Sequence, residues 1–132
     1  MTAHGETPDV LVLDQTDARG EGTDVWHSDN TFMVEPPMGS ILRAIQLPET
    51  GGDTCFASAF AAYEGLSSPM QSMLEELSAV HDLSATLERA NSDGHTNYDV
   101  AAILKKSPPV QHPVVRTHPV TGRKALFVNR NS

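Results

Sequence analysis

The stretch that decides the fold is Trp26-His27-Ser28-Asp29-Asn30-Thr31-Phe32, which places an imidazole and a carboxylate two residues apart. In an extended strand, residues i and i+2 point to the same face, so His27 and Asp29 can both reach one metal ion. Mixed nitrogen and oxygen ligation with open positions is typical of non-haem iron(II) oxygenases. The motif therefore predicts a metal site and favours an oxidative enzyme.

A single His-x-Asp triplet is weak evidence, because a chain with six histidines and 17 acidic residues often contains one by chance. Longer motifs add to it in a fixed order: Pro36-Pro37-Met38-Gly39-Ser40-Ile41-Leu42, Leu47-Pro48-Glu49-Thr50-Gly51-Gly52-Asp53-Thr54, Ala62-Tyr63-Glu64-Gly65-Leu66-Ser67, His112-Pro113-Val114-Val115-Arg116-Thr117-His118-Pro119 and Ala125-Leu126-Phe127-Val128-Asn129. Together, over about residues 24–130, the chain resembles the taurine dioxygenase (TauD/TfdA-like) family of iron(II)- and 2-oxoglutarate-dependent dioxygenases.

This resemblance implies a mainly β fold with helical inserts, the double-stranded β-helix or clavaminate synthase-like jelly roll. Residues 1–132 would form a single, partial domain of that kind. The family completes its iron site with a second histidine, followed by an arginine that pairs with 2-oxoglutarate, and it has a further segment before the first ligands. Because none of these parts matches this chain, we expect a central fragment that is catalytically incomplete by itself.

Residue by residue, the resemblance implies that His27 and Asp29 bind Fe²⁺. Thr54 matches the threonine whose hydroxyl bonds a carboxylate of the co-substrate 2-oxoglutarate. Asn30 and Phe32 match positions that line the substrate pocket, although the family usually has an apolar residue in place of Asn30. No catalytic residue is expected beyond the metal ligands.

The implied reaction uses O₂ and the decarboxylation of 2-oxoglutarate to succinate to hydroxylate a small organic acid, such as a sulfonate, sulfate ester or carboxylate. Two alternatives stay open, a non-catalytic binding or interaction module and an unproductive truncated product. A jelly roll cut in mid-sheet exposes strand edges, which favours aggregation. Family members often form dimers or tetramers, so a homo-oligomer is compatible with the resemblance.

Two histidines could imitate the missing second ligand. His118 lies twelve residues before Arg130, and His112 lies eleven before Arg123. We expect neither to serve, because their segment matches one that precedes the family's second histidine. The proline after each also favours an extended or turn conformation. With two protein ligands, the chain is expected to bind iron(II) weakly and to show no substrate-dependent 2-oxoglutarate turnover.

Composition is ordinary for a globular domain, with 39% hydrophobic and 20% charged residues. No apolar run approaches the roughly 18 residues of a transmembrane span, so no membrane association is expected. The first residues lack the basic and apolar regions of a secretion signal. One cysteine, Cys55, excludes an internal disulfide and fits a reducing compartment, so we expect the cytoplasm.

Charge is uneven along the chain. Residues 1–30 hold seven acids against Arg19 alone, and residues 100–132 hold six bases and no acid. A basic end can attract nucleic acid, but the net charge of −8 and the lack of interleaved aromatic residues argue against it. We expect the two ends to complement each other or a missing segment.

Periodicity and turn residues predict the secondary structure. We expect strands over residues 10–13, 25–34, 41–47, 54–56, 114–116 and 125–128, helices over 57–64, from 68 onward and over 98–106, and loops over 20–22 and 89–95. Ser68 as N-cap, Pro69 and Gln71 form a capping box for the second helix.

Some side chains are assigned by pattern alone. The stripe on the second helix predicts core packing, and it consists of Met70, Met73, Leu74 and Leu77. Phe32 and Phe127 fit either core or pocket positions, and Trp26 fits packing beside the metal strand. Solvent-facing or loop positions are expected for His4, His81 and His95.

Overall fold

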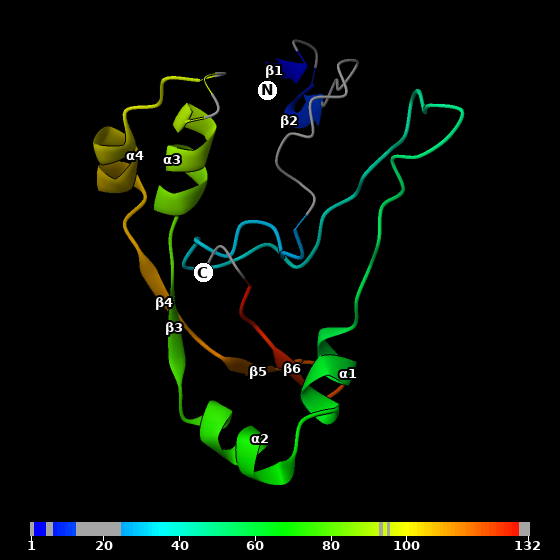
Figure 1. The fold of residues 1–132 in the computed structure, drawn as a ribbon, viewed down its shortest axis with the longest axis vertical. Coiled ribbons are helices and arrows are strands. Elements are labelled where there is room, and N and C mark those ends of the chain that lie inside the picture. The colour runs from blue at the N-terminus through cyan, green and yellow to red at the C-terminus, as the bar shows by residue number, and fades with distance from the viewer. Residues whose placement is uncertain (1, 5–6, 13–24, 93, 95, 130–132) are drawn as a thin grey trace.

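The computed structural model describes residues 2–4, 7–12, 25–92, 94 and 96–129. Figure 1 shows short strands with helices between them. The elements are β1 (Thr2–His4), β2 (Thr7–Val12), α1 (Ala59–Glu64), α2 (Ser68–Glu75), β3 (Ser78–His81), α3 (Ser84–Ser92), α4 (Val100–Lys106), β4 (Val110–Pro113), β5 (Val115–Thr117) and β6 (Lys124–Leu126). Within the described ranges, no helix is long and apolar enough to cross a membrane.

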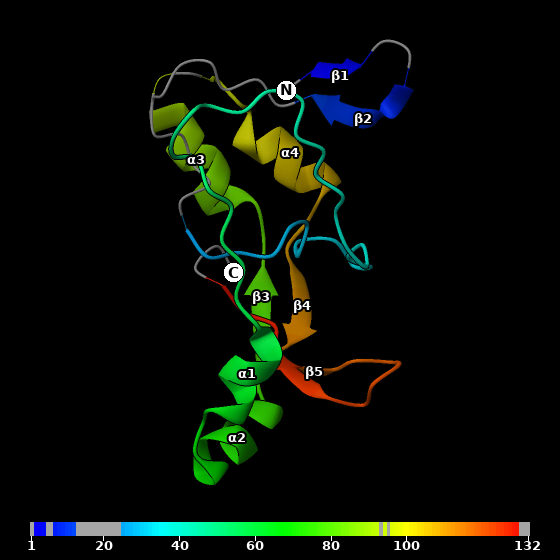
Figure 2. The same cartoon turned by 90° about the vertical axis from the view of Figure 1, so that its right-hand side faces the viewer.

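The strands form three antiparallel pairs, β1 with β2, β3 with β4, and β5 with β6. Val114 joins the last two pairs, because its N–H donates to the carbonyl of Leu77 at 3.0 Å and its carbonyl accepts from the N–H of Phe127 at 2.7 Å. β4 and β5 therefore run through one bend and are paired on both sides of it (Figure 2).

Local sequence explains where the helices begin. The hydroxyl of Ser58 accepts from the N–H of Ala61 at 3.2 Å and caps α1, and Asp99 caps α4 through the N–H of Ala102 at 3.0 Å. Pro69 lies in the first turn of α2, where its missing N–H costs nothing. α1 packs against β6, and α3 packs against α4.

The core is small. Among the described residues its buried apolar side chains are Tyr63, Leu87 and Val114. Three polar side chains are also buried, namely Thr31, His81 and His112. The centre of the molecule is therefore partly built from imidazoles, which need hydrogen-bond partners that aliphatic side chains do not.

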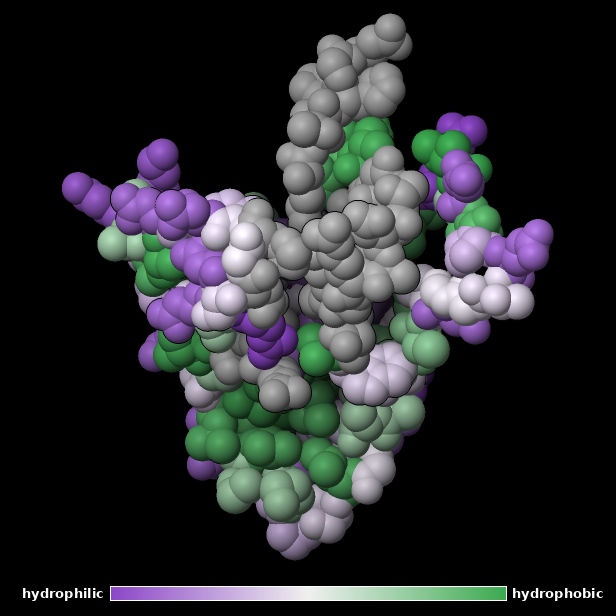
Figure 3. All heavy atoms as spheres, turned by 45° about the horizontal axis from the view of Figure 1, so that its top comes forward, coloured by the Kyte–Doolittle hydropathy of each residue, from purple (hydrophilic) through white to green (hydrophobic). Residues whose placement is uncertain are grey.

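Residues 25–56 contain no helix or strand and run as a long loop, coloured from blue to green, that crosses the middle of the view, extends along its right-hand side and returns to α1 (Figure 1). Several of their large apolar side chains are open to solvent, with Ile41 at 100% and Phe56 at 89% of full exposure. Figure 3 shows much apolar surface left uncovered on one face of the molecule.

The strands predicted over residues 25–34, 41–47 and 54–56 are therefore wrong for this structure. Asn30 has a φ of 54°, in the left-handed region that ends an extended run. A strand also needs a neighbour for its N–H and C=O groups, and no described strand pairs with these residues. The mixture of short strands and helices is confirmed, but facing jelly-roll sheets are not seen in the described part.

The three predicted helices are confirmed as α1, α2 and α4, with somewhat shorter bounds. The capping box is wrong: Ser67 is the N-cap of α2 and makes no side-chain cap hydrogen bond. The amide of Gln71 instead donates to the carbonyl of Tyr63 at 3.0 Å, tying α2 to α1. The apolar stripe is not core, since Met73 is 52% exposed and α2 has no buried residue.

The predicted strands at residues 114–116 and 125–128 are confirmed as the hairpin β5–β6, shifted by about one residue. Its turn places Gly122 at a φ of 69°, which glycine adopts without strain. The loop predicted over 89–95 is wrong for residues 89–92, which end α3. Residues 10–12 lie in β2 as expected, whereas residue 13, the loop 20–22 and His95 lie outside the described residues.

Candidate metal site at His27 and Asp29

The structure brings the two predicted ligands together. Nε2 of His27 lies 3.3 Å from Oδ1 of Asp29, and the side chains are 32% and 55% exposed. Two donors about 2.1 Å from one ion at a right angle are about 3 Å apart. The pair therefore has the spacing that a single divalent ion requires, although the residues lie in a loop and not in the expected strand.

Hydrogen bonding orients the imidazole. Nδ1 of His27 lies 2.8 Å from the carbonyl oxygen of Val25, so Nδ1 carries the proton that it donates. Nε2 then presents a lone pair to the carboxylate of Asp29, and two acceptors face each other. Such a pair is favourable only with a cation or a proton between them, so the donor set fits a metal ion. A backbone partner of this kind is usual for metal-binding histidines.

The carboxylate of Asp29 is also held in place. The hydroxyl of Ser40 donates to Oδ2 at 2.9 Å, which leaves Oδ1 toward His27. Directly after Asp29 the chain makes a turn, closed by the N–H of Met33 donating to the carbonyl of Asn30 at 3.1 Å. The position of this carboxylate therefore depends on the turn at residues 30–33.

A shallow cavity of about 350 Å³ lies beside this carboxylate. It is lined by Ser28, Asp29, Pro36, Pro37, Met38, Gly39, Ser40, Phe56 and Phe127. The sequence left open whether Phe127, which follows β6, lies in the core or in a pocket, and in the structure it lines this cavity. Asn30 is exposed and Phe32 is half-buried, and neither lines this cavity; their role in substrate binding stays a prediction.

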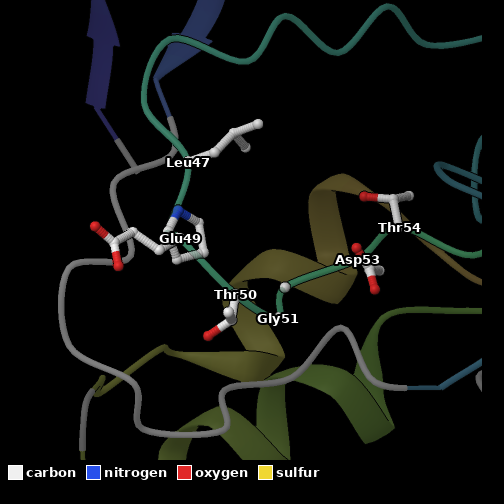
Figure 4. Close-up of a pocket in the computed structure, with 8 residues that line it drawn as sticks. Leu47, Glu49, Thr50, Gly51, Asp53 and Thr54 are labelled. Carbon is white, nitrogen blue, oxygen red and sulfur yellow. The ribbon is translucent and has the colours of Figure 1, made fainter.

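Thr54 lies apart from this cavity. It lines a second hollow of about 330 Å³ formed by residues 47–54 alone, shown in Figure 4. Gly51 and Gly52 make the turn there with φ values of 78° and 76°. The side chain of Thr54 is exposed, and its contact with 2-oxoglutarate stays a prediction.

No cluster of three potential ligands suited to a metal ion is found in the part of the chain that the structure describes. His112 is buried, with Nε2 2.9 Å from the carbonyl oxygen of Met33. Nδ1 of His118 accepts from the N–H groups of Val120 and Thr121, each at 3.2 Å. Both histidines thus have structural partners, and that neither completes the iron site stays a prediction.

His81 is the residue that sequence reasoning missed. Expected at the solvent, it is fully buried in β3, with its ring 5.4 Å from Phe127 and 5.2 Å from His112 between centroids. Burial, and then the charge of His112, lower the pKa of His81. Strand alternation places His81 on the same face as Ala79, but the local sequence does not specify which face of Ser78–His81 is buried.

Two basic residues near the end of the chain form ion pairs with acidic residues in its middle. Arg123 pairs with Glu64 at 2.7 Å and Lys124 with Glu75 at 2.6 Å, so for these two the expected pairing with the acidic first residues is wrong. The hydroxyl of Tyr63 also donates to Glu75. The hydrogen bonds from Lys124 and then from Tyr63 lower the pKa of Glu75, and the same contacts raise the pKa of Tyr63 and of Lys124.

Known proteins resemble the chain along most of its length. It is 34% identical over 141 residues to the alpha-ketoglutarate-dependent sulfate ester dioxygenase of Pseudomonas putida, covering 93% of this chain and 46% of that protein. It is 40% identical over 108 residues to the alpha-ketoglutarate-dependent 2,4-dichlorophenoxyacetate dioxygenase of Cupriavidus pinatubonensis, covering 82% and 36%. The chain spans less than half the length of these relatives.

A solved structure agrees with these matches. The crystal structure of a candidate alpha-ketoglutarate-dependent 2,4-D dioxygenase from Burkholderia xenovorans superposes with a TM-score of 0.64 at 32% identity, covering 81% of this chain and 40% of that one. The family model described as taurine catabolism dioxygenase TauD, TfdA family matches residues 1–132. The chain therefore belongs to the TauD, TfdA family of dioxygenases.

Proposed function

We propose that this chain supplies two iron ligands, His27 and Asp29, to a 2-oxoglutarate-dependent dioxygenase, an oxidoreductase that hydroxylates a small organic acid. The observation that carries the proposal is the 3.3 Å separation of Nε2 and Oδ1, with the imidazole oriented by Val25 and the carboxylate by Ser40. Membership of the TauD, TfdA family supports iron and 2-oxoglutarate over other metal chemistry.

Iron(II), 2-oxoglutarate and dioxygen would supply the oxidising chemistry when bound. The chain's own part is to hold two donors at the metal and to shape the cavity beside them. Asp29 would give a charged oxygen and His27 a neutral nitrogen, which leaves positions free for the co-substrate and dioxygen. The hydroxyl of Thr54 would donate a hydrogen bond to a carboxylate of 2-oxoglutarate.

An anionic organic acid is the proposed substrate class. Relatives are named for sulfonates, sulfate esters and 2,4-dichlorophenoxyacetate, all of which carry an acidic group on an organic body. The cavity beside Asp29 combines the apolar side chains of Met38, Phe56 and Phe127 with the hydroxyl of Ser40, which suits such a body. Asn30 and Phe32 are proposed to contact it in the complete site.

The same proposal covers the complete fold, the cellular compartment and the oligomeric state. We assign the complete fold to the double-stranded β-helix, on the superposition with a solved dioxygenase at a TM-score of 0.64. The exposed thiol of Cys55 is compatible with a reducing compartment such as the cytoplasm. A homo-oligomer remains part of the proposal.

Anaerobic titration with Fe²⁺ and 2-oxoglutarate tests the site through the visible charge-transfer absorption of the bound pair. The band is expected to be weak in the unsubstituted chain and lost in His27→Ala and in Asp29→Ala, because no third candidate ligand lies beside the pair among the described residues. His118→Ala is the matched control, since this histidine bonds only its own turn in the contacts described above. Unchanged absorption in Asp29→Ala, or its loss in His118→Ala, would overturn the ligand assignment.

A further inference from the structure

The segment that carries the candidate metal ligands has no strand to hold it. Residues 25–34 form turns and bends, and the side chains of His27 and Asp29 are partly open to solvent. Metal ligands must be held within a fraction of an ångström of their working geometry, which requires support from packed residues around them. The question is which part of the folded core gives that support.

One long-range contact reaches this segment from the core. Nε2 of His112 lies 2.9 Å from the carbonyl oxygen of Met33, across 79 residues of chain. A carbonyl can only accept, so Nε2 carries the proton and donates it. Met33 is also the residue whose N–H closes the turn on Asn30, so the contact fixes the end of the turn that begins next to Asp29.

His112 is itself rigidly placed. It is 6% exposed and lies in β4, where Ala79 of β3 is its ladder partner. Its ring meets Phe127 edge-on, with centroids 5.3 Å apart, and it also meets His81 at 5.2 Å. A donor fixed by a strand and two rings loses little freedom when it binds a carbonyl.

The cavity beside the metal ligands gives a second link. Asp29 and Phe127 line the same cavity, so the aromatic cluster and the carboxylate segment border one space. We propose that His112 is a positioning residue for the metal site: its hydrogen bond to the carbonyl of Met33 holds the turn that places Asp29. This inference rests on the proposed function, and it adds to it the residue that keeps the ligand pair in place.

The neighbouring imidazole provides a matched control. His81 belongs to the same aromatic cluster, but neither of its ring nitrogens has a hydrogen-bond partner among the described residues. His112→Leu and His81→Leu therefore make the same change of side chain in the same cluster, and only the first removes a bond to the ligand segment. His112→Gln can place an amide N–H near the position of Nε2, whereas His112→Asn is too short.

Two readouts test the proposal on the purified protein, without turnover. Mn²⁺ alone, titrated by electron paramagnetic resonance, reports metal affinity. The chain has one tryptophan, Trp26, next to His27, so its time-resolved fluorescence anisotropy reports the mobility of the ligand segment without metal. Circular dichroism checks that each variant is folded.

We expect His112→Leu to speed the local motion of Trp26 and to weaken Mn²⁺ binding roughly tenfold or more, the size found for outer-shell partners. His81→Leu should change neither value more than about twofold, and His112→Gln should restore both toward the unsubstituted protein. If His112→Leu fails to fold, the comparison of His112→Gln with His112→Asn gives the same test, with the longer amide expected to hold the segment better.

Equal effects of the two leucine variants would overturn the proposal, since the cluster would then have a merely structural role. Unchanged Trp26 motion and Mn²⁺ affinity in a folded His112→Leu variant would also overturn it. If Trp26 moves faster in that variant but His27→Ala leaves Mn²⁺ binding unchanged, the hydrogen bond from His112 would still be shown to hold the segment, and the proposed function would be refuted instead.

Discussion

Two parts of the described chain differ in how they are held by packing, and we call residues 59–129 the packed half and residues 25–56 the exposed half. Residues 59–129 form helices and paired strands joined at Val114, and most of the buried side chains lie there. Residues 25–56 carry all of the predicted site residues, yet they form no regular element and expose apolar side chains such as Ile41 and Phe56. The function is thus proposed for the half with the least packing of its own.

This contrast explains why contacts between the halves matter more than local structure at the site. The loop is tied to the packed half by the hydrogen bond from His112 to Met33, and Asp29 and Phe127 line one cavity between the two parts. Site geometry therefore depends on residues distant in sequence. Loops positioned by a rigid scaffold are where binding and catalytic groups are commonly found.

The largest expected difference between the halves is in stability. Leu87 is 9% exposed in α3, so Leu87→Ala should lower the free energy of unfolding by about 2–5 kcal/mol through lost burial and the cavity it leaves. Ile41 is 100% exposed, and Ile41→Ala should change it by about 0.5 kcal/mol or less. Urea titration followed by circular dichroism measures both. Equal losses would mean that residue 41 is packed in solution.

In residues 59–129 the sequence predicted α1, α2, α4 and the β5–β6 hairpin for physical reasons that are local, but it did not predict β3, α3 or β4. Pro69 near the start of α2, Asp99 before α4 and the glycine turn at Gly122 each fix the backbone by their own chemistry. It failed for the strands over residues 25–34 and 41–47, because a strand is completed only by a neighbouring chain. No described strand pairs with either segment.

For the site, the two-residue spacing correctly predicted that His27 and Asp29 lie together, although in a loop in place of a strand, and their role as metal ligands stays a prediction. A separation of two residues keeps both groups close in either conformation. The contact from His112 to Met33 and the burial of His81 could not be predicted in this way. They arise from the pairing of β3 with β4, and nothing in the local sequence specifies which strands pair.

A second prediction concerns the exposed half. If the hydroxyl of Thr54 contacts a carboxylate of 2-oxoglutarate, Thr54→Val should weaken co-substrate binding by about 1.5–3 kcal/mol, the value of a charge-assisted hydrogen bond. Titration of 2-oxoglutarate in the presence of Fe²⁺ measures this. Thr50→Val, in the same hollow, is the control. Equal weakening in both variants would point to the loop as a whole and not to the Thr54 hydroxyl.

A third and smaller effect tests the aromatic cluster between the halves. Because burial and then the charge of His112 lower the pKa of His81, the folded chain binds fewer protons there than the unfolded chain does. Stability should therefore fall as pH drops below about 6.5, the ordinary value for histidine, and continue to fall until the lowered pKa is passed. A charged group in contact with this cluster is Arg116, whose guanidinium lies 4.6 Å from the Phe127 ring.

His81→Leu should remove part of that acid sensitivity, since leucine has no proton to gain. Thermal unfolding between about pH 5 and pH 8, compared with the unsubstituted protein, measures the difference. His118→Leu is the control, because His118 is exposed and lies in the β5–β6 turn. A pH dependence that His81→Leu leaves unchanged would show that His112 or another group carries it.

The smallest effect concerns the surface of the packed half. Nε and Nη2 of Arg123 both bond Oε1 of Glu64, at 3.1 and 2.7 Å, and the guanidinium also lies 4.6 Å from the ring of Phe60. Both charged side chains are about half exposed, so water and salt screen the pair. A double-mutant cycle with Arg123→Gln and Glu64→Gln should give a coupling of about 0.2–1 kcal/mol, declining in high salt. Coupling that persists in high salt would mean that the two hydrogen bonds of the pair, and not its screened charges, couple Arg123 to Glu64.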